Sequence, residues 1–516
     1  MSIPLMYRED IVETFIVKRA ERMWTSRDDV FSHDCHLSKN VWNQSQYVVE
    51  EEYKKSGDIP TYSYVWAKLS DRSYYKDNPD FDNYHKLPPA TSQQIIKYHN
   101  RAWTSFKEAK EGYFDPDNPK RDNYTGEPKE PKYKKKDGEF ILVFTNQQCK
   151  VRNGYLIFPR RYKGFKIKVR LDDSYTQEGF DLFGDGDYGL YDKKGNLKRN
   201  VKLQEVRVIP AGTGYWIEIV YDKEITRYDL KYSPKYELNE NIIMAIDLGV
   251  ENLGTITDNI GSQPIIVKCP EIKCANQWYN KNKAELSSIY DRNMIGKACL
   301  LKVNKKTKKL EKSLDKYGRI KYLKVYSGPK LDIITDNRNK KVMDELHKFS
   351  RGIIDHALKI KAKTIAIGKN PGWKIKVKMG KKNNQNFVNI PFAKLIKLVR
   401  YKAEEYGIIV LDPTEGYTSK CSFLDSEDIC YHDKYIGERI SRGMFRSSKG
   451  ILVKRGNKTI LINEINADVQ GSYNILRKVD PKFTVYSIME GVAAHGLVPI
   501  RLSVSDLMSE SYKNLS

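Results

Sequence analysis

The chain has 516 residues, of which 40% are hydrophobic and 30% are charged, and this composition supports several compact cores and excludes a disordered chain. Its net charge of +24 favours an extended polyanion as partner. No apolar run approaches the roughly 20 residues of a membrane-spanning helix, and the N-terminus lacks the apolar core of a signal peptide, so nucleic acid is favoured over a membrane.

The first 137 residues are predicted to form one strand followed by a helical block. Ile11–Lys18 is the predicted strand, and Trp42, Trp66 and Trp103 in the helical block are expected in the core rather than as base-stacking platforms. Residues 114–137 are rich in Pro, Asp, Asn and Lys, which indicates an exposed linker. Hydrophobic residues recur at helical spacing in Val41–Tyr53, Tyr62–Leu69 and Ser92–Ala109.

The pattern changes to short strands between Glu139 and Asp222. Lys166, Lys168 and Arg170 alternate with apolar residues, so one face of the predicted sheet is basic. This suits a small β-barrel with a phosphate-facing side, although a solvated face has the same pattern. The predicted strands are Phe140–Phe144, Gly154–Phe158, Phe165–Arg170, Val206–Ile209 and Tyr215–Tyr221.

From Glu237 onward the pattern is that of an α/β domain, and it opens on a buried strand that ends in an acid. Ile242–Ile246 is continuously apolar, Asp247 follows, and Gly249 permits a turn into a second strand at Leu253–Thr257. A carboxylate in this position can hold a divalent cation near a phosphate backbone, and it can equally be a plain turn residue.

Helices and strands alternate after this hairpin, which predicts parallel strands joined by crossover helices. The Lys-rich stretch 302–330 has few apolar residues and is expected to be an exposed hairpin or coil. Helices are predicted at Ala284–Tyr290, Met343–Ile360 and Phe392–Tyr406, and strands at Pro264–Lys268, Thr364–Ile367 and Gly407–Asp412.

Two further carboxylates are expected near Asp247. Glu415 follows the last of these strands, and Asp468 begins a helix whose apolar face carries Val469, Tyr473 and Leu476. Singly, Glu415 is a loop residue and Asp468 an N-terminal helix charge. Together with Asp247 they could bind two Mg²⁺ ions about 4 Å apart for phosphodiester cleavage.

Three motifs in this order resemble the RuvC-type nuclease half of the TnpB and Fanzor proteins, which are transposon-associated, RNA-guided DNA endonucleases related to the type V CRISPR effectors. The motifs are Ala245-Ile-Asp-Leu-Gly249, Tyr417-Thr-Ser-Lys-Cys421 and Asp468-Val-Gln-Gly-Ser-Tyr-Asn-Ile475. A bias toward Lys, Asn and Tyr is typical of an AT-rich eukaryotic or viral genome and favours Fanzor.

The resemblance implies a multidomain α+β fold: an N-terminal β-barrel interrupted by a helical recognition domain, then an RNase H-like (RuvC) α/β nuclease domain with a small inserted nucleic-acid-binding module. The implied boundaries are 1–36 and 131–236 for the barrel (wedge) domain, 37–130 for the recognition domain, 237–417 and 464–480 for the nuclease, 418–463 for the insert, and 481–516 for a tail, to which no chemistry is assigned.

The sequence departs from the family at the second nuclease strand, where many members have a glutamate and this chain has Gly368. Either the nuclease is inactive or another carboxylate replaces that glutamate. Glu415 is the predicted substitute, because neighbouring parallel strands end side by side. The predicted catalytic and Mg²⁺-binding set is therefore Asp247, Glu415 and Asp468, with Asp412 in reserve.

The insert also departs from the family, whose members often carry a zinc ribbon there. The seven cysteines form no CxxC pair, and Cys421, Cys430 and His432 lack a fourth ligand, so structural zinc is not expected. An odd, scattered set of cysteines also indicates a reducing compartment. The residues predicted to contact nucleic acid are Trp373, Lys374, Lys381, Lys382, Lys420, Arg439, Arg442 and Arg446.

The function expected from the resemblance is a Mg²⁺-dependent, guide-RNA-directed endonuclease that cuts double-stranded DNA beside a short target-adjacent motif. Its partners would be guide RNA and target DNA but no membrane, in a monomeric ribonucleoprotein. Its location would be intracellular, and nuclear if the source is eukaryotic or viral. The alternatives are an RNA-guided DNA-binding protein without cleavage and a guide-independent nuclease or transposase of the same fold.

Overall fold

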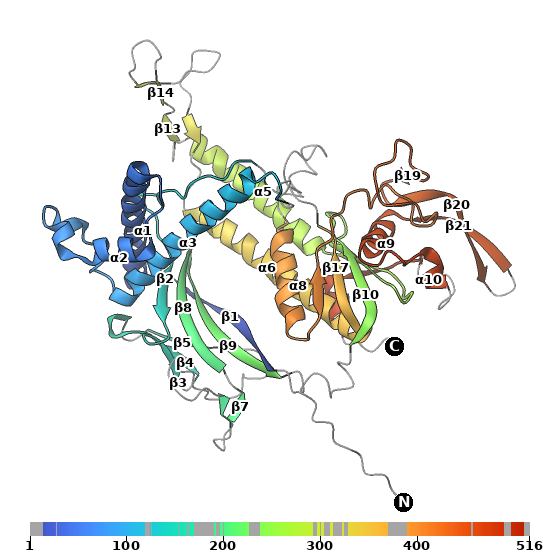
Figure 1. Ribbon diagram of the computed structural model, residues 1–516, viewed down its shortest axis with the longest axis horizontal. Coiled ribbons are helices and arrows are strands. Elements are labelled where there is room, and N and C mark those ends of the chain that lie inside the picture. Colours follow the sequence, from blue (N-terminus) through green and yellow to red (C-terminus); the bar gives the residue numbers. More distant parts are fainter. Residues whose placement is uncertain are drawn as a thin grey trace, which may run out of the picture. The chain divides into compact units, whose positions relative to one another are not determined.

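Contacts divide the chain of this computed structural model into two compact units, Met1–Thr226 and Arg227–Ser516 (Figure 1). Each unit has its own helices and sheet. The residues that the structure describes are 14–26, 28–118, 124, 126–152, 154–162, 165–169, 190–191, 197–199, 201–226, 238–292, 297–299, 301–303, 310–312, 322–324, 329–369, 390–455, 458–489 and 497–509.

The first unit contains the expected helices, with an earlier start for the first. Asp28 caps this helix by accepting hydrogen bonds from the backbone of Val30 and Phe31. Trp42 and Trp103 are buried as expected, but the expectation for Trp66 is wrong: it is 37% exposed, and its indole N–H donates to Tyr84 Oη at 3.0 Å. The helices are α1 (Asp29–Ser56), α2 (Tyr62–Ser70) and α3 (Pro89–Phe114).

The strands of the first unit form open sheets in the part of the chain described, so the expected closed barrel is not seen. The largest sheet has the order β1-β9-β8-β2, with β1 and β2 at its two edges, and β3, β4 and β5 form a second sheet. The strands are β1 (Thr14–Ser26), β2 (Leu142–Thr145), β3 (Lys150–Arg152), β4 (Tyr155–Ile157), β5 (Lys166–Lys168), β6 (Leu190–Tyr191), β7 (Leu197–Arg199), β8 (Val201–Ala211) and β9 (Gly214–Thr226).

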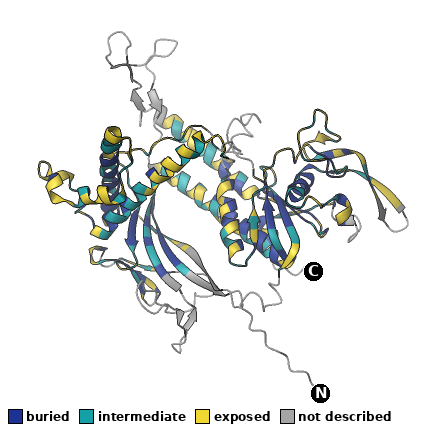
Figure 2. Cartoon of the chain, viewed as in Figure 1, coloured by how far each residue is buried: buried dark blue, intermediate teal, exposed yellow. Residues whose placement is uncertain are grey.

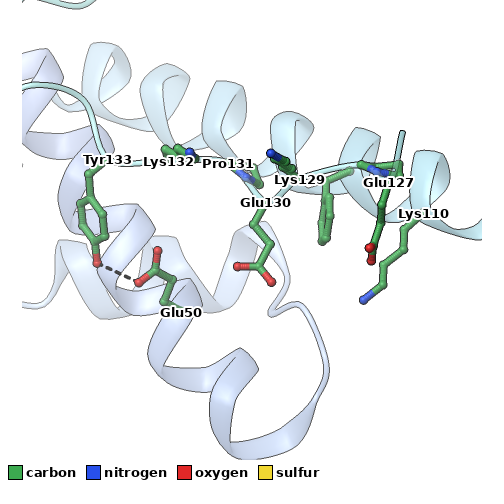
Figure 3. Close-up of a pocket in the computed structure, with 10 residues that line it drawn as sticks. Glu50, Lys110, Glu127, Lys129, Glu130, Pro131, Lys132 and Tyr133 are labelled. Atoms are coloured by element: carbon green, nitrogen blue, oxygen red, sulfur yellow. Dashed lines mark hydrogen bonds between the residues drawn. The ribbon is translucent and has the colours of Figure 1, made fainter. Parts of the chain in front are cut away.

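Part of the predicted linker is an extended segment, 126–136, tied to α1. Gln46 Nε2 donates to the carbonyl of Pro131 at 2.8 Å, and Tyr133 Oη donates to Glu50 Oε2 at 3.2 Å. Figure 3 shows Tyr133 and Glu50 joined in this way, in a pocket of about 670 Å³ that Lys110 of α3 also lines. Side-chain hydrogen bonds to its carbonyls therefore fix a segment without regular structure.

The second unit is built on a six-stranded sheet with the order β18-β17-β10-β11-β12-β22. The hairpin β10–β11 and the parallel pairs β10–β17 and β17–β18 confirm the α/β prediction. The strands of this sheet are β10 (Asn239–Asp247), β11 (Gly254–Asp258), β12 (Ile265–Lys268), β17 (Ala362–Ile367), β18 (Ile409–Leu411) and β22 (Ile500–Ser503).

Helices cover both faces of this sheet, and the buried strands lie between them (Figure 2). On one face Met244 and Ile246 pack with residues of α6 and α8. On the other face Ala245 and Ala366 pack with α9 and the segments around it. The helices are α5 (Pro270–Arg292), α6 (Pro329–Lys359), α8 (Phe392–Glu404), α9 (Ala467–Val479), α10 (Val485–Met489) and α11 (Val504–Met508).

Two features of the second unit extend the sequence prediction. The C-terminal segment supplies β22, which pairs with β12 in parallel, and the insert forms a three-stranded antiparallel sheet. Within the described residues, no helix is both long and apolar enough to span a bilayer. The remaining strands are β13 (Lys297–Cys299), β14 (Leu301–Val303), β15 (Leu310–Lys312), β16 (Tyr322–Lys324), β19 (Glu438–Ser441), β20 (Met444–Arg455) and β21 (Lys458–Asn466).

Candidate functional site

Asp247 is the last residue of β10, and strand alternation decides which face it joins. Ala245 belongs to the core on the α9 face and Ile246 to the core on the opposite face. Asp247, two residues after Ala245, therefore faces α9. A Cβ atom on Gly471 of α9 would lie only 2.6 Å from Asp247 Oδ2, so the carboxylate rests directly on this helix.

Gly368 lies beside Asp247, directly after the neighbouring strand β17. Ile246 is in register with Ile367, and the Gly368 N–H donates to the Ile246 carbonyl at 3.0 Å. A Cβ atom on Gly368 would lie 2.7 Å from Glu415 Oε1 and 2.9 Å from Glu415 Cγ. Together with Ile475 Cδ1, which would lie 2.5 Å away, the Glu415 side chain thus occupies the space where a side chain of residue 368 would begin.

The backbone after β18 brings Glu415 to this place. Lys369 and Thr414 form a parallel bridge that continues the β17–β18 pairing. The Lys369 N–H donates to the Pro413 carbonyl at 3.0 Å, and the Glu415 N–H donates to the Lys369 carbonyl at 3.2 Å. Two strands that end side by side therefore deliver the glutamate from the second one, as the sequence predicts.

Asp468 lies in the first turn of α9, as expected. Asn466 caps the helix by accepting from the backbone N–H groups of Asp468 and Val469. Asn252 Nδ2, from the β10–β11 turn, donates to Asp468 Oδ2 at 2.6 Å. The hydrogen bond holds the carboxylate at the same edge of the sheet as the Asp247 strand end.

Three other residues of α9 fix the geometry, and sequence reasoning assigned them no role. The Ser472 hydroxyl contacts the carbonyls of Ala245 at 3.2 Å and Thr255 at 3.1 Å. Asn474 Nδ2 donates to the carbonyls of Thr418 and Cys421, both at 2.8 Å. The small side chains at 471 and 472 allow close approach of the helix to the sheet, and the buried amide fastens the turn that follows Glu415.

The three carboxylates act on one another electrostatically. Burial, then the negative charges of Glu415 and Asp468, raise the pKa of Asp247 well above its usual range, and Arg439 opposes this shift. Arg439 Nη2 also lies 3.9 Å from Asp468 Oδ1. A bound cation would lower the repulsion between these carboxylates.

A cleft of about 980 Å³ opens at this edge of the sheet and is lined by Glu415 and Asp468. Arg439 and Arg442, from the strand β19 and the turn after it, line the same cleft. Glu251, on the turn after β10, pairs with Arg442 at 3.2 Å and with Lys273 of α5 at 2.6 Å. The cleft therefore combines acidic residues with basic walls that suit a phosphodiester backbone.

The ligand atoms of Asp247, Glu415 and Asp468 do not all lie within 4.8 Å of one another. Among the described residues, one group of three meets that spacing, namely Cys269, Glu271 and Glu345. Burial raises the pKa of the Cys269 thiol to about 12, which disfavours the thiolate that binds metals.

The other predicted residues lie elsewhere or cannot be placed. Lys420 Nζ stands 5.4 Å from the centre of the Tyr435 ring, and Arg446 pairs with Glu464 at 2.8 Å. The reserve acid, Asp412, pairs with Arg400 at 2.8 Å and Lys369 at 3.3 Å. The predicted residues Trp373, Lys374, Lys381 and Lys382 lie outside the described part of the chain.

The cysteines of the insert form local contacts. The Cys421 thiol donates to the Cys430 carbonyl at 3.6 Å, and Cys430 Sγ lies 3.4 Å from His432 Nε2. Arg477 of α9 donates to the carbonyls of Glu427 and Ser426, which ties the base of the insert to the helix. The insert is thus attached to the same helix that carries Asp468.

Comparison with known proteins finds one informative sequence relative. The chain is 23% identical to the TnpB-like protein ORF457 of Acidianus two-tailed virus over 460 residues, which cover 86% of this chain and 81% of that protein. No family model matches. The chain is therefore similar over most of its length to a TnpB-like protein.

Comparison with solved structures finds weaker similarities. A Cas12f1–sgRNA–target DNA complex aligns at a TM-score of 0.40 with 14% identity, over 87% of this chain and 82% of that chain. CasPhi-2 (Cas12j) bound to crRNA aligns at 0.32 with 10% identity, over 90% and 98% of the two chains. At these TM-scores the likeness does not establish a common fold.

Proposed function

We propose that the protein is a guide-RNA-directed, metal-dependent endonuclease that cuts double-stranded DNA, with Asp247, Glu415 and Asp468 as its catalytic acids. The observation that carries the proposal is the close fit of Glu415 over Gly368. Many members of the resembled family have a glutamate at the position of Gly368. Glu415 supplies a carboxylate beside Asp247 in its stead. An inactive relative would have no need for such a replacement.

The three acids fit magnesium. All are oxygen donors, which hard divalent cations prefer, and the repulsion that raises the pKa of Asp247 falls when a cation binds. Asp247, Glu415 and Asp468 would hold two Mg²⁺ ions, which supply an activated water and stabilise the leaving oxygen. Gly471 and Asn252 position the carboxylates of Asp247 and Asp468 through the contacts described above.

The basic residues of the cleft would bind the scissile strand. Arg439 and Arg442 can donate charge-assisted hydrogen bonds to phosphate oxygens. Glu251 holds Arg442 beside the cleft, so its guanidinium is positioned before DNA arrives. The segment that contains Trp373, Lys374, Lys381 and Lys382 would contact the heteroduplex or the scissile strand. Unchanged binding and cleavage by a Lys381→Ala/Lys382→Ala variant would contradict that role.

The guide and the target motif are inferred from the resemblance to TnpB and Fanzor proteins and from similarity to a TnpB-like viral protein. A net charge of +24 suits two nucleic-acid partners. Residues 1–236 would hold the guide RNA and read the target-adjacent motif, as a monomeric ribonucleoprotein. Assignment to the Fanzor branch, and with it a nuclear location, rests on the bias toward Lys, Asn and Tyr and on the combination of Gly368 with Glu415.

Sequencing the RNA that co-purifies with the protein tests the guide, because a single defined species is expected. Plasmids that contain the matching target then test cleavage with Mg²⁺, with the Glu415→Gln variant as the inactive control. Binding without cutting by the wild type would favour an RNA-guided DNA-binding protein. Cutting without a defined RNA would favour a guide-independent nuclease.

A further inference from the structure

A second cavity, of about 780 Å³, lies in the first unit between α1, the short turns of residues 72–83 and the extended segment 133–136. It is far from the carboxylates in sequence and belongs to a different compact unit. Its volume lies in the range of small-ligand pockets.

Four aromatic side chains with large exposed surfaces line this cavity. Tyr47 is 52% exposed, Tyr74 38%, Phe81 61% and Tyr133 47%. By contrast, Trp103 in the same unit is fully buried. Exposed rings gathered at one concave site mark a binding surface, and flat rings are the side chains on which unpaired bases stack.

The Tyr133 ring and the backbone that carries Phe81 are held in place before any ligand binds. The Tyr133 hydroxyl donates to Glu50, which fixes the far end of that ring (Figure 3). The backbone carbonyl of Phe81 accepts from Gln44 Nε2 and from Asn83 Nδ2. A preformed site of this kind loses less conformational entropy on binding.

The charges around the cavity favour an anionic ligand. Lys39, Lys134 and Lys136 line it, against one acid, Asp80. Lys39 Nζ donates to the Lys136 carbonyl at 2.5 Å, and Lys134 Nζ lies 4.3 Å from the centre of the Trp42 ring. Lys134 and the exposed Lys136 thus add positive charge to the lining of the cavity, which favours a ligand that carries a phosphate.

We propose that this cavity binds an unstacked base of single-stranded nucleic acid, with its phosphate on the lysines. Aromatic faces beside positive charge match a nucleotide better than an apolar peptide, because an apolar peptide offers no anion to the lysines. The proposal does not rest on the nuclease site, and it holds equally for a protein that does not cleave.

The test measures binding of short fluorescent single-stranded RNA and DNA to the full-length protein, freed of bound nucleic acid by high salt. Phe81→Ala should weaken binding about 5- to 150-fold, the range for loss of one stacked base. Phe114→Ala is the matched control, because Phe114 is 58% exposed and does not line the cavity. Melting temperatures of both variants show that they fold.

A salt series separates the contributions of stacking and charge to the affinity. Contacts to the phosphate backbone weaken in 0.5 M salt, whereas the difference between Phe81→Ala and the wild type that comes from stacking should persist. Photocrosslinking with thio-substituted bases should mark peptides containing Tyr47, Tyr74 or Tyr133. The RNA and DNA arms identify the preferred strand. Equal affinities for Phe81→Ala and Phe114→Ala, or crosslinks that fall only elsewhere, would overturn the proposal.

Discussion

At the scale of single residues, two glycines decide where the carboxylates can stand. Gly368 leaves space for Glu415, and Gly471 leaves space for Asp247. A glycine without a side chain is therefore part of the site directly after β17 and again on α9. The absence of a side chain at residue 368 is therefore what allows Glu415 to pack at this position.

Adding one methyl group tests this arrangement. Gly368→Ala places a Cβ atom 2.5 Å from Ile475 Cδ1 and 2.7 Å from Glu415 Oε1, so both side chains must move, and cleavage should fall about 100-fold, the cost of a misplacement near 1 Å. Gly416→Ala is the control, because its nearest neighbour would be Lys478 Nζ at 3.9 Å. Cleavage rates on a programmed plasmid check this, and equal rates for both variants would contradict the role of Glu415.

The raised pKa of Asp247 predicts a pH dependence of stability without metal. The folded protein holds this proton to higher pH than the unfolded chain, so the free energy of unfolding falls as pH rises from about 4 to the raised pKa. Asp247→Asn removes this loss, and a tenfold difference in proton affinity is worth about 1.4 kcal/mol.

Thermal unfolding in EDTA at pH 4 and pH 8 checks this expectation. The variant should be the more stable protein at pH 8 and similar to the wild type at pH 4, and it should lose the stabilisation that Mg²⁺ gives the wild type. A wild type that is unaffected by Mg²⁺ would argue against a metal site at Asp247.

At the scale of elements, α9 organises the site. It carries Asp468, supports Asp247 through Gly471, and holds the turn after Glu415 through Asn474. The sequence predicts this helix and its acid from the apolar spacing of Val469, Tyr473 and Leu476. It does not predict the roles of Ser472 and Asn474, because their partners lie on strands and turns that are far away in the chain.

The difference between local patterns and contacts that are distant in the chain also explains which other elements the sequence predicts. The apolar run of β10 and the helical periodicity of α6 are local patterns, and the structure contains both elements. The four residues of β22 are half polar and gain their strand from pairing with β12, more than two hundred residues away. Residue type alone predicts that Trp66 is buried, and the packing of α2 leaves it partly exposed.

Asn474→Ala tests the contribution of α9 to the site. The side chain is fully buried, and its loss leaves two carbonyls without their donor, at about 1–3 kcal/mol each. We expect a lower melting temperature for the second unit and weaker Mg²⁺ binding, because the turn after Glu415 is released. Asn282→Ala is the control, since that amide makes one exposed contact within α5. Equal stability of the two variants would show that Asn474 does not fasten the turn.

At the scale of the whole molecule, charge should dominate the affinity for nucleic acid. The chain has 90 Lys and Arg residues against 66 Asp and Glu, and arginines line the cleft of the second unit while lysines line the cavity of the first. Each phosphate that a basic residue neutralises releases a counterion, so affinity falls with salt in proportion to the number of such contacts.

Affinity for target DNA and for guide RNA should therefore fall about 10³- to 10⁵-fold between 50 and 200 mM salt, the range for six to ten phosphate contacts. Fluorescence anisotropy across a salt series measures the slope. Glu415→Gln should keep the wild-type slope while abolishing cleavage, because it changes the catalytic acids and none of the basic residues. A slope near zero would mean that the positive charge does not face nucleic acid, and it would remove the argument from composition on which the proposed partners depend.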